Sequence, residues 1–255
     1  MNDYFTWKGK KSTEFGMHVE KMPDVIIPQE RLTFQTVPGR SGTIATRTGE
    51  AAYEDFTLPI ECFIEDYSRI ADIAVWLKGR GNLVVPSRPN GYYDAYPVNQ
   101  INFKRVMSQY PYCTVALNFR CQPFFYPMGV GYENVVIPYS GYTLKNPCTY
   151  YAEPRITLVL DDHALFWVGD MSFAVTVDAL SVVTIDSYMQ EVTCTSGDCQ
   201  FTGNYPLLPA GDAVIRWESN APTTLYSTKT PVTEGIPFMS GPVLSVQIEP
   251  RWRSL

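Results

Sequence analysis

The stretch Phe56-Thr57-Leu58-Pro59-Ile60-Glu61-Cys62-Phe63-Ile64 decides the fold class, because an apolar residue occupies every even-numbered position. Successive side chains of a strand point to opposite faces, so this period of two predicts a strand with one buried face. Leu32–Val37 alternates in the same way, and Val25–Ile27 is a shorter apolar run. We expect all three segments to be half-buried strands.

One segment of the first half, Asp66–Gly79, has its apolar residues at helical spacing instead. Asp66 is a suitable N-cap and Gly79 a suitable stop signal. The pattern therefore predicts a single helix near residues 67–78.

Further along the first half, Val98–Arg105 and Tyr112–Cys121 are expected to be long strands, preceded by a turn-rich segment at Arg88–Tyr93. The alternation lapses around Gln122–Gly129. This lapse predicts a domain junction between residues 125 and 145.

The second half consists of short strand-like runs at regular spacing, separated mostly by Gly, Asp, Asn or Pro. The runs are Arg155–Leu160, Ala164–Val168, Ser172–Val177, Ser181–Asp186, Glu191–Thr195, Cys199–Thr202, Ala213–Glu218, Thr223–Ser227 and Val243–Pro250. Such a cadence without a helix is typical of a two-sheet β-sandwich. We therefore expect an all-β protein with one helix, divided into a β-rich domain at residues 1–135 and a sandwich at residues 136–255.

The composition disfavours two classes of function, nucleic-acid binding and membrane insertion. The 255 residues are 45% hydrophobic and 18% charged, as in packed globular proteins. A net charge of −6 repels a phosphate backbone, so we expect no nucleic-acid binding. The polar N-terminus and the lack of any run of about 18 apolar residues predict a protein without signal peptide or membrane insertion, made in the cytoplasm.

The loop Val37-Pro38-Gly39-Arg40-Ser41-Gly42-Thr43-Ile44 has the glycines and hydroxyls of a phosphate-binding loop. It lacks the Gly-Lys-Ser/Thr ending and the following helix that such a loop requires. We interpret it as a Pro-Gly turn in a hairpin that exposes Arg40 and Arg47.

No convincing catalytic set is present, and we expect neither enzymatic activity nor a cofactor. Asp161-Asp162-His163 contains ligand types for a divalent metal, but a hairpin turn explains the same residues. A carboxylate pair for glycoside hydrolysis could come from Glu61, Glu65 and Asp66, although a strand end and a helix cap already account for them.

Six cysteines in a chain of this length do not form a disulfide framework, and we expect most to be reduced and buried. Cys194 and Cys199 flank a short segment containing Gly197. A disulfide between them and a pair of reduced thiols at strand ends both remain open.

The aromatic segment Arg88–Tyr96 (RPNGYYDAY) allows two interpretations. Tyr92 and Tyr93 could stack on a sugar or base. They could equally contact a neighbouring subunit, since Tyr and Arg are enriched at interfaces.

Several phrases, in order, resemble the distal tail protein (Dit) family of long-tailed, non-contractile bacteriophages. They are Phe5–Gly9 with Glu14–Val19, Val37–Gly42, Trp76-Leu77 with Gly81–Leu83, Ala152–Thr157, Pro206–Trp217 with Asp212 where the family has Asn, and Ile248–Leu255. The resemblance spans almost the whole chain.

The resemblance implies an N-terminal ring-forming (belt) domain and a C-terminal galectin-like sandwich, whose last strand at 243–250 could return toward the first domain. It also implies a homohexameric hub in the virion, at the siphovirus tail tip or baseplate. Such a ring joins the tail tube, built of the major tail protein, to the tail-tip protein and can anchor receptor-binding proteins. Subunit or tube contacts would then include Arg40, Arg47, Tyr92 and Tyr93.

The sequence offers two alternatives to a structural hub. A carbohydrate-binding module would hold a cell-wall saccharide on Trp217, Tyr226 or Trp167 of the sandwich. A cell-wall hydrolase is disfavoured by the lack of a catalytic set.

Overall fold

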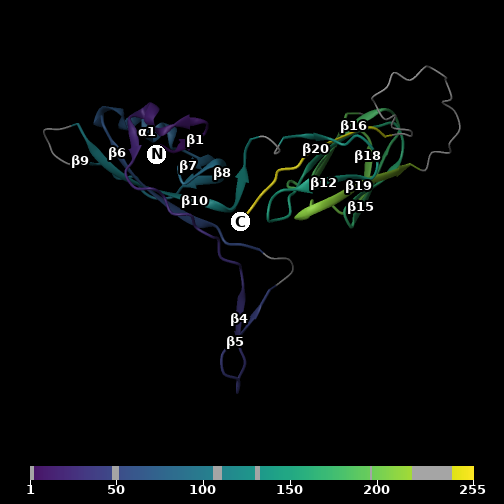
Figure 1. Ribbon diagram of the computed structural model, residues 1–255, viewed down its shortest axis with the longest axis horizontal. Coiled ribbons are helices and arrows are strands. Elements are labelled where there is room, and N and C mark those ends of the chain that lie inside the picture. Colours follow the sequence, from purple (N-terminus) through teal and green to yellow (C-terminus); the bar gives the residue numbers. More distant parts are fainter. Residues whose placement is uncertain (1–2, 48–51, 106–110, 130–132, 196, 220–242) are drawn as a thin grey trace. The chain divides into compact units, whose positions relative to one another are not determined.

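The computed structural model describes residues 3–47, 52–105, 111–129, 133–195, 197–219 and 243–255. The chain divides into two compact units, Met1–Met128 with Leu255 and Gly129–Ser254 (Figure 1). Both units are built from antiparallel strands, and the prediction of an all-β protein is confirmed.

The first unit contains an eight-stranded sheet in the order β2-β1-β7-β8-β10-β6-β3, with β9 paired to β10, and a separate two-stranded sheet of β4 and β5. Its strands are β1 (Thr6–Trp7), β2 (Lys10–Lys11), β3 (Met17–Val19), β4 (Thr33–Thr36), β5 (Thr43–Thr46), β6 (Phe56–Ile64), β7 (Gly81–Val85), β8 (Arg88–Pro97), β9 (Lys104–Arg105) and β10 (Cys113–Pro127). Its helical segments are the 3-10 turns Ser12–Phe15 and Tyr67–Arg69 and the helix α1 (Ile70–Trp76).

Strand β6 shows the burial that its sequence predicts. Its even-numbered residues are buried, and all its odd-numbered residues but the half-buried Phe63 are exposed. The buried side chains form one core with those of β10 and α1. Alternation thus sets which face of the sheet is covered.

The helix is shorter than predicted but begins and ends near the expected residues. The Asp66 carboxylate accepts a hydrogen bond from the Ser68 amide at 2.8 Å, and this cap opens a 3-10 turn that leads into α1. Within α1, Ile73 and Trp76 are the buried side chains. The helix therefore packs on the core of the sheet through a narrow stripe of apolar side chains.

Two tryptophans join the first strand to the end of α1. Trp7 Nε1 donates to the Trp76 carbonyl at 3.1 Å, and Trp76 Nε1 donates to the Trp7 carbonyl at 3.2 Å. The Trp76 ring also stacks on Phe5 and Phe15, with centroids 5.6 and 4.4 Å away. These contacts satisfy both buried indole donors while burying a large apolar area.

Two predicted half-buried strands are not half-buried. Val25–Ile27 forms no strand, and Val25 and Ile27 are 56% and 81% exposed. The run at Leu32–Val37 does contain a strand, β4, but all of its residues are exposed. Alternation fails here because β4 pairs only with β5, so neither face meets a core.

The predicted turn at Arg88–Tyr93 is instead the start of strand β8, and the turn lies at Pro86-Ser87. Gly91, the residue that suggested a turn, is needed for close packing. A Cβ atom there would lie 2.4 Å from Phe125 Cζ and from the Tyr126 carbonyl oxygen. A glycine inside a strand thus marks the close approach of a neighbouring strand, here β10.

The prediction of a long strand at Val98–Arg105 is wrong except for β9. The Asn99 side chain occupies the ladder positions beside β10, donating to the Ala116 carbonyl and accepting from the Asn118 amide, both at 2.9 Å. Strand β10 itself continues past Cys121 to Pro127. A register shift between Cys121 and Phe125 explains why its alternation lapses.

The second unit consists of two five-stranded sheets, in the orders β11-β20-β13-β16-β17 and β12-β19-β14-β15-β18. The strands are β11 (Val135–Val136), β12 (Tyr142–Asn146), β13 (Arg155–Leu160), β14 (Ala164–Val168), β15 (Met171–Val177), β16 (Ser181–Asp186), β17 (Glu191–Cys194), β18 (Cys199–Gly203), β19 (Gly211–Ser219) and β20 (Val243–Glu249). The buried side chains of both sheets form one hydrophobic core. The predicted two-sheet arrangement is therefore present in this unit.

The boundaries of the predicted strands in the described part of this unit agree closely with the structure, but β11 and β12 were not predicted and one connection differs. Strands β13 and β14 lie in different sheets, so Asp161–His163 is a connection between sheets and not a hairpin turn. The predicted strand Thr223–Ser227 lies outside the described residues.

The substitution Trp7→Phe should destabilise the first unit by about 2–3 kcal/mol, because it removes the indole donor and leaves the buried Trp76 carbonyl without that hydrogen bond. Urea unfolding at neutral pH measures the loss. The matched control is Trp167→Phe, which changes a half-buried indole of the second unit and should cost less than about 1 kcal/mol. Equal losses for the two variants would contradict the role of the Trp7–Trp76 pair.

Candidate functional site

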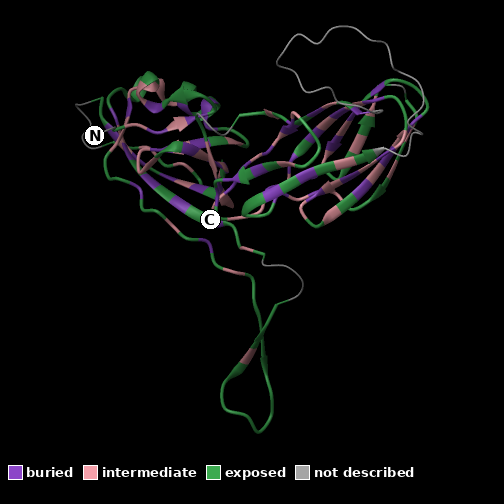
Figure 2. Ribbon diagram, turned by 45° about the vertical axis from the view of Figure 1, so that its right-hand side comes forward, coloured by how far each residue is buried: buried purple, intermediate pink, exposed green. Residues whose placement is uncertain are grey.

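A long run of exposed residues in the described part of the chain is the hairpin arm, which we define as residues 29–47 and 52–54. At its base, the Arg31 amide donates to the Ala52 carbonyl at 2.7 Å and the Glu54 amide donates to the Gln29 carbonyl at 2.8 Å. Beyond the base, β4 and β5 pair only with each other. Figure 2 shows the arm exposed along nearly all of its described length.

The tip of the arm is the predicted Pro-Gly turn. The Arg40 amide donates to the Val37 carbonyl at 3.1 Å, and Gly39 has a φ of 81°, which suits the third position of a type II turn. A strand, and no helix, follows the loop. The segment therefore lacks the helix N-terminus that phosphate binding uses.

The arm is basic in a chain of net charge −6. Between Arg31 and Arg47 it contains three arginines and no acidic residue. Arg31 pairs with Glu54 at 2.7 Å and Arg47 with Glu30 at 3.0 Å, so the base is neutralised. Arg40, at the tip, forms no ion pair with any described residue, and its charge faces solvent.

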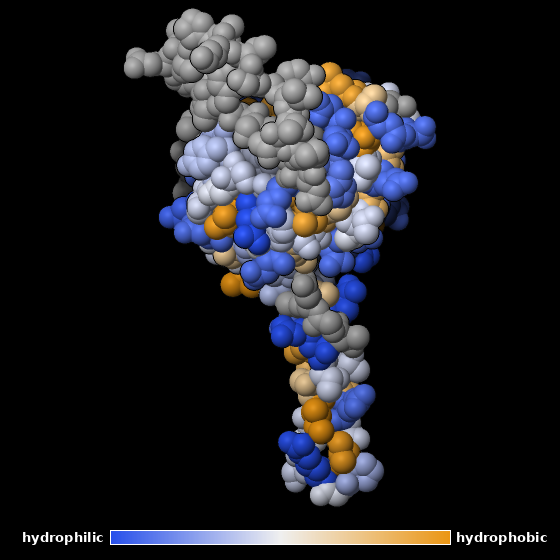
Figure 3. Space-filling view, turned by 90° about the vertical axis from the view of Figure 1, so that its right-hand side faces the viewer, coloured by the Kyte–Doolittle hydropathy of each residue, from blue (hydrophilic) through white to orange (hydrophobic). Residues whose placement is uncertain are grey.

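The arm and the segment before it also expose apolar side chains. Phe34 is 60% exposed, and Leu32 and Val37 are 37% and 39% exposed. In Figure 3, hydrophobic and hydrophilic groups alternate along the arm. We refer to these side chains, together with the exposed Val25 and Ile27, as the assembly surface.

An exposed two-stranded hairpin is at best marginally stable in water, and apolar side chains gathered on a surface commonly mark an interaction site. The arm therefore has no core of its own and presents apolar side chains to solvent. The predicted contact residues Arg40 and Arg47 both lie on it, and the ion pair of Arg47 holds the base of the hairpin.

The two tyrosines predicted at contacts are placed differently. Tyr93 is 3% exposed and packs in the core of its own unit, where its hydroxyl accepts a hydrogen bond from Arg88 at 2.9 Å. Tyr92 is half-buried and stacks on Tyr126, with ring centroids 5.3 Å apart. We explain Tyr93 as a core residue, because its ring has almost no accessible surface.

The candidate sugar contacts do not form one platform. Trp217 lies on the inner side of its sheet, 6.4 Å from the ring of Phe166. Trp167 lies on the opposite face, beneath the Arg216 guanidinium at 4.5 Å. Tyr226 lies outside the described residues. A saccharide could not stack on Trp167 and Trp217 together.

Three of the residues considered for catalysis or metal binding, His163, Glu65 and Asp66, have structural partners. Among the described residues, no group of three His, Cys, Asp or Glu side chains is placed to hold a metal ion. His163 Nδ1 lies 2.8 Å from the Thr176 hydroxyl, and Glu65 lies 3.3 Å from His18 Nε2. Hydrogen bonds from Ser68 lower the pKa of Asp66, which disfavours it as a proton donor. None of the helices in the described ranges is long and apolar enough to cross a membrane.

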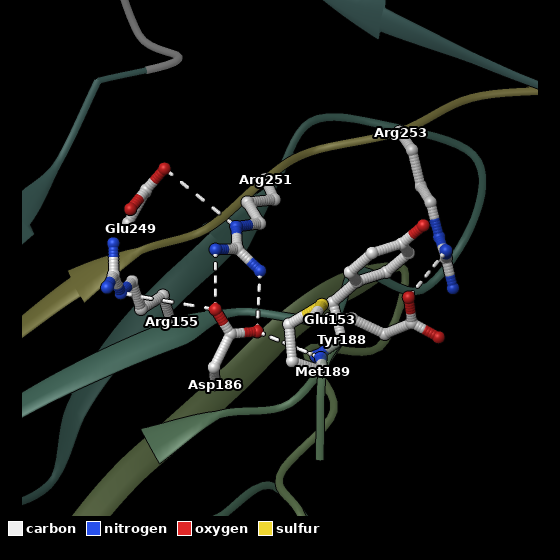
Figure 4. A network of polar contacts seen from close by, with 8 residues as sticks. All are labelled: Glu153, Arg155, Asp186, Tyr188, Met189, Glu249, Arg251 and Arg253. Carbon is white, nitrogen blue, oxygen red and sulfur yellow. Dashed lines mark hydrogen bonds and ion pairs between the residues drawn. The ribbon is translucent and has the colours of Figure 1, made fainter. Parts of the chain in front are cut away.

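The segment Ile248–Leu255, which resembles the Dit family, contributes Arg251 and Arg253 to a polar network on the second unit (Figure 4). Arg251 makes two hydrogen bonds of 2.8 Å to the Asp186 carboxylate, which also accepts from the Tyr188 and Met189 amides at 3.1 Å. Arg253 pairs with Glu153 at 2.9 Å. The segment therefore acts as a structural clasp.

Two features show how firmly the clasp is held. Trp252, between the two arginines, is 4% exposed and belongs to the hydrophobic core. Arg251 has a φ of 53°, in the left-handed region that costs a non-glycine residue about 1 kcal/mol or more. The bidentate pair with Asp186 offsets this strain. Arg251 also lowers the pKa of the Asp186 carboxyl.

The clasp should make the second unit sensitive to acid. A carboxyl whose pKa is lower in the folded than in the unfolded state stabilises the fold above the unfolded value of about 4, and this stabilisation is lost as the pH falls through the folded pKa. We expect Asp186→Asn to lower the free energy of unfolding by about 1–2 kcal/mol at pH 7. The difference from the parent protein should shrink as the pH falls below about 4. Urea unfolding over this pH range provides the test, and a difference that stays constant down to pH of about 2 would contradict it.

The comparisons with known proteins agree with this architecture. No protein-family model matches the sequence, and no curated protein matches it significantly. Among solved structures, the chain is similar to SPP1 Dit (gp 19.1), described as a paradigm of hub adsorption apparatus in phages that infect Gram-positive hosts. The similarity has a TM-score of 0.69 at 12% identity and covers 96% of both chains. The resemblance to the distal tail proteins is thereby confirmed at the level of the fold.

Proposed function

We propose that this chain is a structural subunit of the hub at the tip of a bacteriophage tail. In this proposal it resides in the virion and assembles into a homohexameric ring that links the tail tube to the tail-tip or baseplate proteins. Receptor-binding proteins could attach to the same ring. The observation that carries the proposal is a fold shared with SPP1 Dit over 96% of both chains, combined with an ordered arm that has no core of its own.

A ring needs two different surfaces on each subunit, because a head-to-tail contact must repeat until the rotation closes. The eight-stranded sheet offers two unlike edges. One edge is β2, which carries the exposed Lys10 and Lys11, and the other is the three-residue strand β3. Short edges of this kind suit pairing with a defined neighbour while limiting open-ended aggregation.

The assembly surface supplies a second kind of contact. Burying exposed apolar side chains such as Phe34 and Ile27 against another protein contributes about 25 cal/mol per Å² of apolar area removed from water. The unpaired Arg40 would meet a carboxylate, and the acidic net charge of the chain makes a second copy a chemically suitable partner. We therefore assign the arm to subunit contacts within the hub or with the tube next to it.

Removing apolar contact area from the arm, or reversing the charge at its tip, should weaken assembly while leaving the fold of the subunit intact. We expect Phe34→Ser and Arg40→Glu each to raise the concentration needed for ring formation at least about tenfold, a loss of about 1.4 kcal/mol per contact. Light scattering and negative-stain electron microscopy would measure assembly, and thermal unfolding would check the subunit. The melting temperature should change by less than about 2 °C, because both side chains are exposed.

The matched control is Val75→Ser, which removes an apolar side chain that is 67% exposed on α1. This variant should assemble like the parent protein. Rings that form equally well in all variants would overturn the role of the arm. A parent protein that stays monomeric at all concentrations, alone and with tail-tube protein, would overturn the proposed hub function.

A further inference from the structure

Two cysteines lie where the sheets of the second unit are joined at one edge. Cys194 is the last residue of β17 and Cys199 the first residue of β18. The two strands are edge strands of different sheets, and no backbone ladder connects them. A covalent bond between these residues would therefore link the two layers of the sandwich directly.

The two thiols are also placed for reaction with each other. Cys194 and Cys199 are at the facing ends of β17 and β18, which contact each other, and both side chains are partly exposed. The other four cysteines are buried, and burial raises the pKa of the Cys62 and Cys121 thiols to about 12. Since a disulfide reagent must reach the sulfur and the thiolate is the reactive form, the partly exposed pair is more accessible to reaction than the four buried cysteines.

We propose that Cys194 and Cys199 are a redox modification site that closes to an intramolecular disulfide when the protein meets an oxidising disulfide such as oxidised glutathione. One cysteine thiolate attacks a glutathione sulfur and releases one molecule of reduced glutathione. The second thiolate then attacks the mixed disulfide and releases another. The protein loses two protons and two electrons, and the glutathione disulfide gains them.

The reaction should be slow at neutral pH and faster in alkali. Burial, followed by the proximity of Cys194, raises the pKa of the Cys199 thiol above its ordinary value. The thiolate fraction at pH 7 is therefore small and grows with pH. Once formed, the bond would restrict the unfolded chain and so stabilise the second unit.

The test uses the full chain incubated with oxidised glutathione at about pH 8, then unfolded and alkylated. We expect four alkylated cysteines instead of six, an intact mass about 2 Da lower before alkylation, and a linked peptide containing Cys194 and Cys199. The oxidised form should melt about 5 °C higher than the reduced form. Cys194→Ser, incubated in the same way, should show no such rise.

Other products would overturn the inference. These are six alkylated cysteines after prolonged incubation, a lasting glutathione adduct on either residue, or a disulfide between two chains. Should Cys194→Ser fail to fold, the alkylation pattern of the parent protein still decides the question. The measurement is independent of ring formation, so its failure would leave the proposed hub function untouched.

Discussion

Backbone pairing along β10 is the interaction on which the first unit depends. This fifteen-residue strand pairs with β6 on one side and β8 on the other, and β9 pairs with its first residues. The ladder joins Cys121 to Phe56, which are far apart in sequence. The core can therefore form only after a long loop has closed. The Trp7–Trp76 pair then fixes the first strand and the end of α1 over the same core.

The arm stands outside this arrangement. Its hydrogen bonds and ion pairs define its shape, but no buried side chain beyond its base stabilises it. In an isolated subunit, the exposed Phe34 ring and Arg40, which pairs with no described residue, contribute nothing to the stability of the fold. Both would contribute favourably to the free energy of association if a partner covered them. In the proposed hub, a partner would cover these side chains, and this links the proposed function to the physical properties of one segment.

The sequence was most informative where a strand has one buried and one exposed face. In the second unit, strand ends agree with the structure within a few residues, because inward and outward positions differ in polarity. Prediction failed where tertiary contacts determine the local structure. Gly91 lies in a strand because Phe125 packs against it, and the Asn99 side chain takes the place of a strand beside β10.

For the candidate site, the Pro-Gly turn and the exposure of Arg40 could be read from sequence. The isolation of β4 and β5 from any core could not be predicted, because alternation does not say whether another layer packs against the apolar face of a strand. The ion pair of Arg47 with Glu30 was equally out of reach, because no local pattern connects those residues. The burial of Tyr93 was missed because a tyrosine suits a core and an interface equally well.

The position of β20 has a consequence for the timing of folding during synthesis. This strand lies between β11 and β13, and the clasp residues that follow it bind Asp186 and Glu153. One sheet of the second unit thus stays incomplete until β20 has left the ribosome, and its clasp until Arg253 has followed. All strands of the first unit precede residue 128, so that unit can fold while the other is still being made. The two units can therefore reach their native states one after the other.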